Sequence, residues 1–401
     1  MTRAEFHQAI RQRFPLERPV REGGLVIYGQ TSDISVLNPM LVSDVLSARI
    51  TSLVFDALVS VSPLDGLSAP GLADFWQRSD DGLRYTFHLN QNATWHDGRP
   101  VTADDVVFTY RAFLAEESPS GSKGTVATYL ADVRKVDEHT VDLLAKDRSA
   151  TFVEHTAGLV SILPRHIWES VPLTDWGRDP GTTGKDPRRV IGSGPFQFRE
   201  WILNSHVTLD KRPDHWDPHL RPVIDTLMFR VLSASSAVLQ AFEVGEIDIV
   251  DVETQEVAPL KQGRPDAEFT AFDTLNFGYF VTMQDPERTE LFVDVPVRQA
   301  LMYALDRQLL IDTVFDGYAV PATGTQPVPS IAYRPDQITT KYVHDPARAR
   351  QLLEEAGWIV GNDGIRQRNG VRFSFECFFA DSFPLFAQIL PYMQQAWREV
   401  G

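Results

Sequence analysis

The sequence of 401 residues contains a single cysteine, Cys377. One cysteine forms no intramolecular disulfide, and it excludes metal sites that are built from several thiolates. Cys377 lies in the alternating stretch VRFSFECFFA (371–380), whose period-2 pattern predicts a buried strand with Cys377 as a small core residue. The lone cysteine does not fix the cellular compartment, because exported proteins can fold without disulfides.

Long apolar segments are also missing. The first 24 residues contain no apolar stretch of signal-peptide length, and no segment of the length needed to span a bilayer follows them. Two interpretations stay open at this point: a cytoplasmic protein, or an exported protein whose leader is absent from this sequence.

The sequence has no excess of positive charge. Its 38 Lys and Arg residues against 54 Asp and Glu residues give a formal charge of 38 − 54 = −16. Affinity for nucleic acid needs clustered Lys and Arg, so this balance argues against a nucleic-acid partner. Otherwise the acidic excess mainly favours solubility.

Motifs for catalysis and metal binding are missing as well. The ten histidines include no H-E-x-x-H arrangement, and no G-x-S-x-G nucleophile turn occurs. His88 and His96 straddle a predicted turn, which does not predict a metal site. Gly192-Ser193-Gly194 lacks P-loop spacing, and Pro195 removes one backbone donor, so a tight turn is predicted there. The sequence therefore predicts neither an enzyme nor a bound metal or cofactor.

The residues that are present predict a well-packed α/β protein of more than one domain. Apolar residues make up 43% of the chain, and 401 residues exceed the size at which one core stops growing. The strand–helix–strand order over 224–232, 236–244 and 246–252 predicts a crossover unit and thus a partly parallel sheet. Later in the chain, 297–315 predicts one long helix that ends before Gly317.

The stretch from Gly71 to Leu114 carries the clearest local signals. Tyr85, Phe87 and Leu89 alternate with polar residues, which is typical of a half-buried strand. Thr102 is predicted to cap the following helix, with Asp105 at capping-box spacing.

Four separated motifs together resemble a known family. They are GLADFWQRSDDGLRYTFHLNQNATWHDGRPVTADDVVFTY (71–110), IGSGPFQFREWILNSHVTLDKRPDHWD (191–217), VDVPVRQALMYALDRQLLIDTVFDGYAVPATG (293–324) and DPARARQLLEEAGW (345–358). The combination resembles the bacterial extracellular solute-binding proteins of family 5, the receptors of oligopeptide and dipeptide ABC importers.

The resemblance implies an α/β fold of the two-lobed, periplasmic-binding-protein type II, with an extra subdomain. We expect an N-terminal extension over 1–22, a first lobe from 23–44 and 186–272, an inserted subdomain over 45–185, and a second lobe over 273–401. The family chain continues past this point, so the second lobe is expected to be incomplete at its C-terminal end.

The resemblance also implies ligand-binding residues. In the family, the loop after the first strand meets the ligand backbone, and here that loop is Thr31, Ser32, Asp33 and Ile34. Tyr129 matches an aromatic position that reaches the cleft in oligopeptide receptors.

Further ligand contacts are expected in the second lobe. Asn276, Phe277 and Tyr279 lie where the chain is expected to cross between the lobes and could face the cleft. Asp381 stands where related dipeptide receptors carry an arginine for the peptide carboxylate, so a free dipeptide is disfavoured as the ligand.

We therefore expect a non-enzymatic, monomeric receptor that captures a solute between two lobes and delivers it to an ABC permease. This implies a periplasmic or lipid-anchored cell-surface location, with a leader missing from the sequence. A leaderless ligand sensor on the same fold is the alternative. Oligopeptides, oligosaccharides, nickel chelates and opine-like compounds remain open as ligands, because a fold does not fix its ligand.

Overall fold

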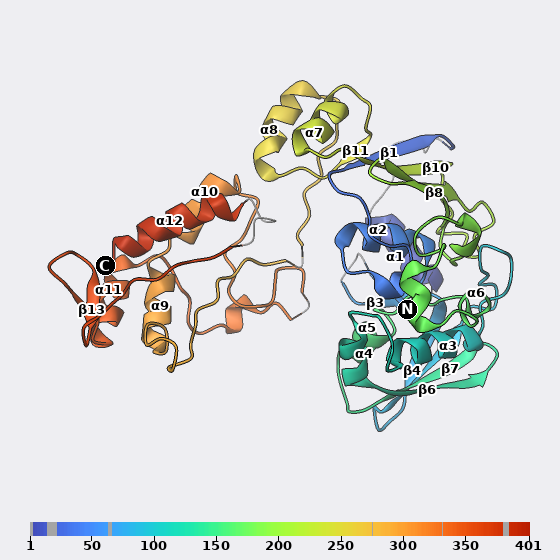
Figure 1. Cartoon of the computed structure of the whole chain (residues 1–401), viewed down its shortest axis with the longest axis horizontal. Helices are drawn as coiled ribbons and strands as arrows, with labels where there is room; N and C mark the ends of the chain where they lie inside the picture. Colours follow the sequence, from blue (N-terminus) through green and yellow to red (C-terminus); the bar gives the residue numbers. More distant parts are fainter. Residues whose placement is uncertain (1–2, 14–21, 63–65, 275, 331, 380–384) are drawn as a thin grey trace. The chain divides into compact units, whose positions relative to one another are not determined.

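The computed structural model describes the chain except for residues 1–2, 14–21, 63–65, 275, 331 and 380–384. The chain divides into two units, Met1–Asp251 and Val252–Gly401. Both units mix helices and strands, which confirms the predicted α/β class (Figure 1). The predicted domain boundaries within and between the lobes stay predictions.

A mixed five-stranded sheet forms one half of the first unit. Its strands are ordered β11-β1-β10-β9-β8. β1 lies parallel to β10 and β11, while β10, β9 and β8 form an antiparallel meander. The bounds are β1 Leu25–Gln30, β8 Phe196–Ile202, β9 His206–Lys211, β10 Thr226–Val231 and β11 Ile249–Val250. Helix α7 (Ser235–Glu243) connects β10 to β11, which confirms the predicted crossover unit.

An antiparallel four-stranded sheet, ordered β4-β5-β7-β6, forms the other half of the first unit. The bounds are β4 Ala73–Arg78, β5 Arg84–Leu89, β6 Leu130–Asp137 and β7 Thr140–Ala145, with a separate two-stranded pair of β2 Val59–Val61 and β3 Ser68–Pro70. Figure 1 shows helix α3 (Ala103–Leu114) lying along this sheet. Tyr85, Phe87 and Leu89 of β5 are buried as their alternation predicts.

The predicted capping of α3 is also confirmed. The Asp105 carboxylate accepts a hydrogen bond from the Thr102 backbone N–H at 2.9 Å, which satisfies a donor at the helix start. The remaining helices of the first unit are shorter or less regular: α1 Arg3–Arg13, α2 Val45–Val54, α4 Lys123–Tyr129, α5 Phe152–Thr156 and α6 Arg165–Trp168, with 3₁₀ turns at Pro39–Leu41, Leu173–Arg178 and Pro187–Arg189.

The turn at Gly192-Ser193-Gly194 holds the two halves of the first unit together. A β-carbon on Gly192 would overlap the carbonyl oxygen of Val54, and the Gly194 N–H donates to that same oxygen at 2.9 Å. The buried Arg212 guanidinium donates to the carbonyl oxygens of Thr94 at 2.8 Å and Ser193 at 3.3 Å. The predicted tight turn is thus confirmed, and a single hydrophobic cluster extends through both halves.

The second unit is mainly helical. Its core gathers buried residues of α9 and α11 around Trp358, which is fully buried. The elements are α8 Thr254–Gly263, α9 Val295–Tyr303, α10 Arg307–Val314, a 3₁₀ turn at Pro335–Gln337, α11 Pro346–Glu355, α12 Phe386–Arg398, and the small sheet of β12 Ile359–Val360, β13 Arg366–Arg368 and β14 Val371–Arg372. No helix in the described parts of the chain is both long and apolar enough to cross a membrane.

Two sequence expectations about the second unit are wrong. The single helix predicted over 297–315 is broken between α9 and α10, because Asp306 caps a new helix by accepting from the Leu309 N–H at 3.0 Å. Cys377 is exposed and not a core residue. Phe373 and Phe375 pack against the core as alternation predicts, but β14 ends at Arg372, and after the Phe373 N–H, which donates to Arg366 of β13, no described strand pairs with 375–379.

The Gly192 contact leads to a stability prediction. Gly192→Ala should lower the free energy of unfolding by about 3 kcal/mol, because the added methyl group overlaps backbone atoms that cannot move aside. Differential scanning calorimetry measures this change. Gly121→Ala is the matched control, since a β-carbon there meets nothing within 4 Å. Equal effects of the two substitutions would contradict the role given to this turn.

His96 leads to a prediction on pH. Its Nδ1 accepts from the Gly192 N–H at 3.1 Å, and its Nε2 lies 3.0 Å from the Gly194 carbonyl oxygen. Burial lowers the pKa of His96 from the ordinary 6.5 to about 4, although the hydrogen bond to Gly194 acts the other way. As the pH falls, His96 is therefore protonated at a higher pH in the unfolded chain than in the folded protein. The free energy of unfolding should fall as the pH drops from about 6.5 towards 4.

The comparison variant for this prediction is His96→Asn, whose amide oxygen can still accept from Gly192 but does not titrate. Chemical unfolding between pH 7 and pH 4.5 measures the free energy of unfolding of both proteins. This free energy should fall more steeply with decreasing pH in the native protein, because the native protein takes up about one more proton on unfolding than the variant does. Parallel pH profiles of the two proteins would show that His96 is not the group responsible.

Candidate functional site

The carboxyl ends of three parallel strands meet at one edge of the mixed sheet. In the strand register, Gln30 at the end of β1 pairs with Val231 at the end of β10, and Gly29 pairs with Val250 at the end of β11. In open α/β sheets, ligands bind at this kind of edge, where the strand order reverses direction. The loop that follows β1 contains the predicted residues Thr31–Ile34.

Thr31 and Ser32 are the two predicted loop residues that face solvent. Both are exposed, and neither side chain has a hydrogen-bond partner within the described residues. Their hydroxyl groups are therefore free to bind a ligand without first breaking a contact in the protein.

Asp33 fastens the loop to the hairpin between β8 and β9. Its carboxylate accepts from the Trp201 indole N–H at 2.9 and 3.1 Å and from the Asn204 N–H at 2.6 Å. Asn204 adopts a left-handed conformation with φ of 56°, which aims its N–H at the carboxylate. The Asp33 carboxylate is thus occupied by donors of the protein itself.

Ile34 turns into the core. Its side chain is only 4% exposed and belongs to the main hydrophobic cluster. Its N–H donates to the Asp33 carboxylate at 2.8 Å. The structure therefore places Ile34 as an anchor of the loop, and its side chain does not face solvent.

The far end of the loop is tied to the start of helix α2. The Ser35 N–H donates to the Ser47 hydroxyl at 2.9 Å, and the Asp44 carboxylate accepts from the Ser47 N–H at 2.7 Å. Burial raises the pKa of Asp44, but hydrogen bonds from Ser35 and Ser47 outweigh it and lower the pKa below its usual range. Thr31 and Ser32 consequently project from a loop that is held on both sides.

A charged group that sequence reasoning missed lies at the same sheet edge. The Arg49 guanidinium donates to the Asp251 carboxylate at 2.9 Å and lies 4.6 Å from the centre of the Tyr28 ring. Burial, followed by a hydrogen bond to Asp251, raises the pKa of Tyr28, so this phenol stays neutral. In the sequence, Asp251 comes directly after β11, and this position is the signal that could have pointed to the Arg49–Asp251 pair.

Gln30 is a second missed residue at this edge. Its side chain is 5% exposed, and neither amide atom has a hydrogen-bond partner within the described residues. A buried amide without a partner is costly, so such groups are uncommon in folded proteins.

The other predicted residues are not brought to the loop by any described contact. Tyr129 ends helix α4, is half-buried, and stacks on His155 with ring centres 4.8 Å apart. Asn276, Phe277 and Tyr279 are exposed on an irregular segment of the second unit, where the two aromatic rings lie 5.5 Å apart. Asp381 lies outside the described residues.

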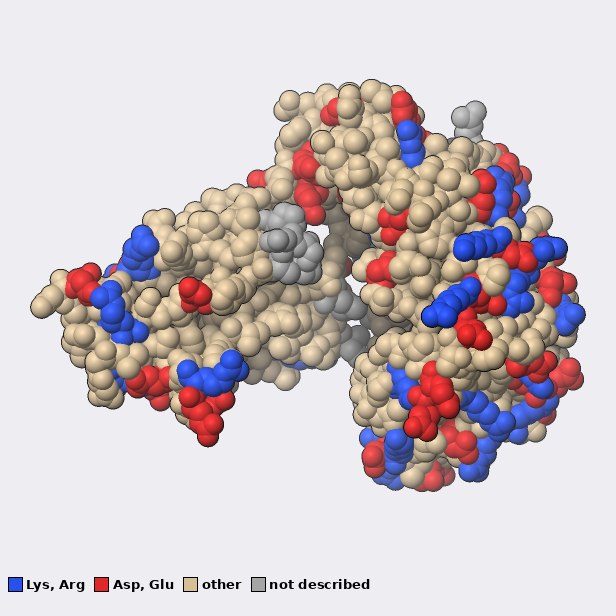
Figure 2. Space-filling view, in the orientation of Figure 1, with Lys and Arg blue, Asp and Glu red and all other residues tan. Residues whose placement is uncertain are grey.

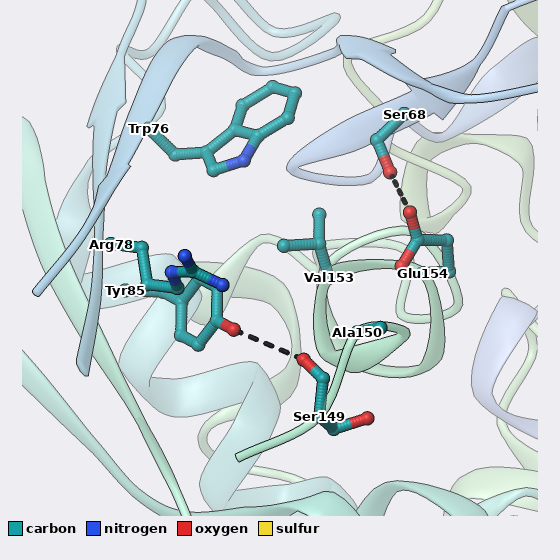
Figure 3. Close-up of a pocket in the computed structure, with 8 residues that line it drawn as sticks. All are labelled: Ser68, Trp76, Arg78, Tyr85, Ser149, Ala150, Val153 and Glu154. Carbon is teal, nitrogen blue, oxygen red and sulfur yellow. Dashed lines mark hydrogen bonds between the residues drawn. The ribbon is translucent and has the colours of Figure 1, made fainter. Parts of the chain in front are cut away.

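Neither of two hollows in the first unit contains a predicted ligand residue. One, of about 310 Å³, is lined by residues of β3, β4, β5 and α5 (Figure 3). The other, of about 730 Å³, lies beside the end of β5 and the β6–β7 turn.

Among the described residues, no three His, Cys, Asp or Glu side chains are grouped to hold a metal ion. On the face of the molecule that Figure 2 shows, the described Lys and Arg side chains of the first unit lie among Asp and Glu side chains.

Comparison with known proteins identifies the family. The model of the bacterial extracellular solute-binding proteins, family 5 (middle region), matches residues 68–401. The chain belongs to this family. The resemblance stated from four sequence motifs is thereby confirmed.

Named relatives point in the same direction. The chain is 28% identical over 382 residues to the oligopeptide-binding protein AppA of Bacillus subtilis, covering 95% of this chain and 68% of that protein. It is 32% identical over 339 residues to a putative ABC transporter peptide-binding protein of Brucella ovis, covering 82% of this chain and 58% of the relative. The Bacillus subtilis AppA structure, in complex with a nonapeptide, matches with a TM-score of 0.74 and 27% identity, covering 96% of this chain and 74% of that chain.

The hydrogen bonds of Asp33 lead to a prediction on the loop. Asp33→Ala should lower the free energy of unfolding by about 2–3 kcal/mol, because it leaves the Trp201 and Asn204 donors without an acceptor. Thr31→Ala, two residues away and exposed, should change stability by less than about 0.5 kcal/mol. Calorimetric unfolding of both variants measures the difference. A stable Asp33→Ala variant would contradict the anchoring role.

Proposed function

We propose that this protein is the receptor of an ABC importer, and that it captures a peptide for delivery to a membrane permease. The supporting observation is the anchored loop at the carboxyl edge of the mixed sheet, where Thr31 and Ser32 are exposed and have no side-chain partner in the described part of the chain. The family match and the relatives named as peptide-binding proteins support the peptide as the ligand class.

Binding in this proposal rests on hydrogen bonds between the 31–32 segment and the main chain of the peptide. Main-chain contacts suit a receptor that accepts many sequences, because every peptide carries the same N–H and C=O groups. The Arg49–Asp251 pair, close to the same edge, supplies both signs of charge for a peptide terminus. Asn276, Phe277 and Tyr279, together with Asp381 and Tyr129, are the further ligand contacts of this proposal.

Closure of the two lobes over the ligand is the mechanism that we assign to the receptor. Hinge closure is established for periplasmic binding proteins in general. A closed form excludes water from the ligand and offers the permease a surface that the empty receptor lacks. The proposal includes a location outside the cytoplasmic membrane, a lipid anchor and a monomeric receptor.

A ligand screen tests the proposal directly. Peptides of three to nine residues should raise the thermal midpoint, since a ligand at 100 times its Kd stabilises the folded state by about 2.7 kcal/mol. Dipeptides should give smaller shifts, and maltotriose and nickel–histidine should give none. Native mass spectrometry of the purified protein should show retained peptide. Stabilisation by the sugar or the nickel chelate alone, or by nothing, would refute a peptide receptor.

The loop can be tested with the same peptides. Thr31→Ala combined with Ser32→Ala should weaken peptide binding about tenfold in calorimetric titration, because two hydrogen bonds are removed. The free energy of unfolding should stay unchanged, since both side chains are exposed and have no hydrogen-bond partner among the residues that the structure describes. Ser170→Ala, at an exposed position outside the loop, is the control. Unaltered binding by the double variant would remove this loop from the site.

A further inference from the structure

The 310 Å³ hollow in Figure 3 lies in the antiparallel half of the first unit. Ser68 comes from β3, Trp76 and Arg78 from β4, and Tyr85 from β5. The segment 149–150 and helix α5 close the other side. Small-molecule sites have volumes of about 300–1,000 Å³, so this hollow fits a ligand of amino-acid size.

One wall of the hollow carries an unpaired positive charge. Arg78 ends β4 opposite Tyr85 in the strand register, and its side chain is exposed. Its guanidinium makes no hydrogen bond or ion pair within the described part of the chain. A free guanidinium presents a planar fork of donors that matches the two oxygens of a carboxylate.

The opposite wall carries a fixed negative charge. Glu154 accepts from the Ser68 hydroxyl at 2.9 Å through one carboxylate oxygen, which orients the group. In Figure 3 the Glu154 carboxylate and the Arg78 guanidinium lie on either side of Val153, and the two form no ion pair with each other. The second oxygen of Glu154 has no partner among the described residues, and it can accept from an ammonium group.

The surfaces between the two charges are apolar and firmly held. Trp76 and Val153 line the hollow, and the Trp76 ring stacks at 6.1 Å on Phe87, which is fully buried. Tyr85 is 5% exposed, stacks at 4.3 Å on Phe152, and donates to the Ser149 carbonyl oxygen at 3.3 Å. A ligand would therefore meet preformed walls, which lowers the entropic cost of binding.

We propose that this hollow is an accessory site for a small zwitterion with an apolar body, of the size of a free amino acid. The ligand carboxylate pairs with Arg78, its ammonium group pairs with Glu154, and its side chain lies against Trp76 and Val153. A simple anion would leave Glu154 facing a like charge, and a simple cation would leave Arg78 unmatched. The site shares no residue with the 31–34 loop and does not depend on the proposed peptide site.

Isothermal titration of the full chain with three related probes tests this site. L-Leucine carries both charges, L-leucinamide lacks the carboxylate, and N-acetyl-L-leucine lacks the ammonium group. L-Leucine should bind at least about tenfold more tightly than either analogue, since each charged hydrogen bond contributes about 1.5–3 kcal/mol. Absence of L-leucine binding to the native chain would overturn the proposal.

Two substitutions test which charged group of the ligand each of the two side chains binds. Arg78→Gln should weaken L-leucine about tenfold and leave L-leucinamide unchanged, whereas Glu154→Gln should weaken L-leucine and leave N-acetyl-L-leucine unchanged. Arg84→Gln, an exposed arginine of the same sheet outside the hollow, is the matched control and should bind as the native protein does.

A third variant separates this site from the peptide loop. The Thr31→Ala, Ser32→Ala double variant should keep full L-leucine affinity. Loss of L-leucine binding in that variant, together with normal binding by Arg78→Gln, would place the amino acid at the loop and refute the accessory site.

Discussion

The first unit depends on the close contact between the Gly192-Ser193-Gly194 turn and the end of helix α2. The glycines leave no room for a β-carbon, so the Gly194 N–H reaches the Val54 carbonyl oxygen. The buried Arg212 guanidinium also holds the turn, by donating to the carbonyl oxygens of Ser193 and of Thr94, which follows β5. This contact joins the two halves of the first unit at the C-terminal end of α2.

The candidate site depends on a loop that is fixed at two points. Asp33 ties it to the β8–β9 hairpin, and Ser35 ties it to the start of α2. The exposed pair Thr31 and Ser32 lies between these anchors and the end of β1. A loop held in this way loses little conformational entropy when a ligand binds, so most of the interaction energy is available for affinity.

Sequence patterns predicted best where short-range rules dominate. The alternation in β5 and the capping box that Thr102 and Asp105 form at the start of α3 were both predicted, because each depends on neighbours a few residues away. The apolar pattern failed at two places in the second unit, because it reports neither a helix cap nor strand pairing. Asp306 starts a new helix inside a periodic apolar stretch, and Cys377 is exposed because no described strand pairs with its segment. The periodicity of apolar residues along a segment does not show whether another strand pairs with that segment.

The sequence by itself determined the family and the α/β class, since both follow from residue types at fixed spacing, and the resemblance to the family pointed to the loop that contains Thr31 and Ser32. Only the tertiary structure decided which loop residues are anchors and which are free. It also brought Arg49 to Asp251 and set Arg78 and Glu154 on opposite walls of one hollow. Those pairs are distant in the chain, so they meet only when strands and helices pack.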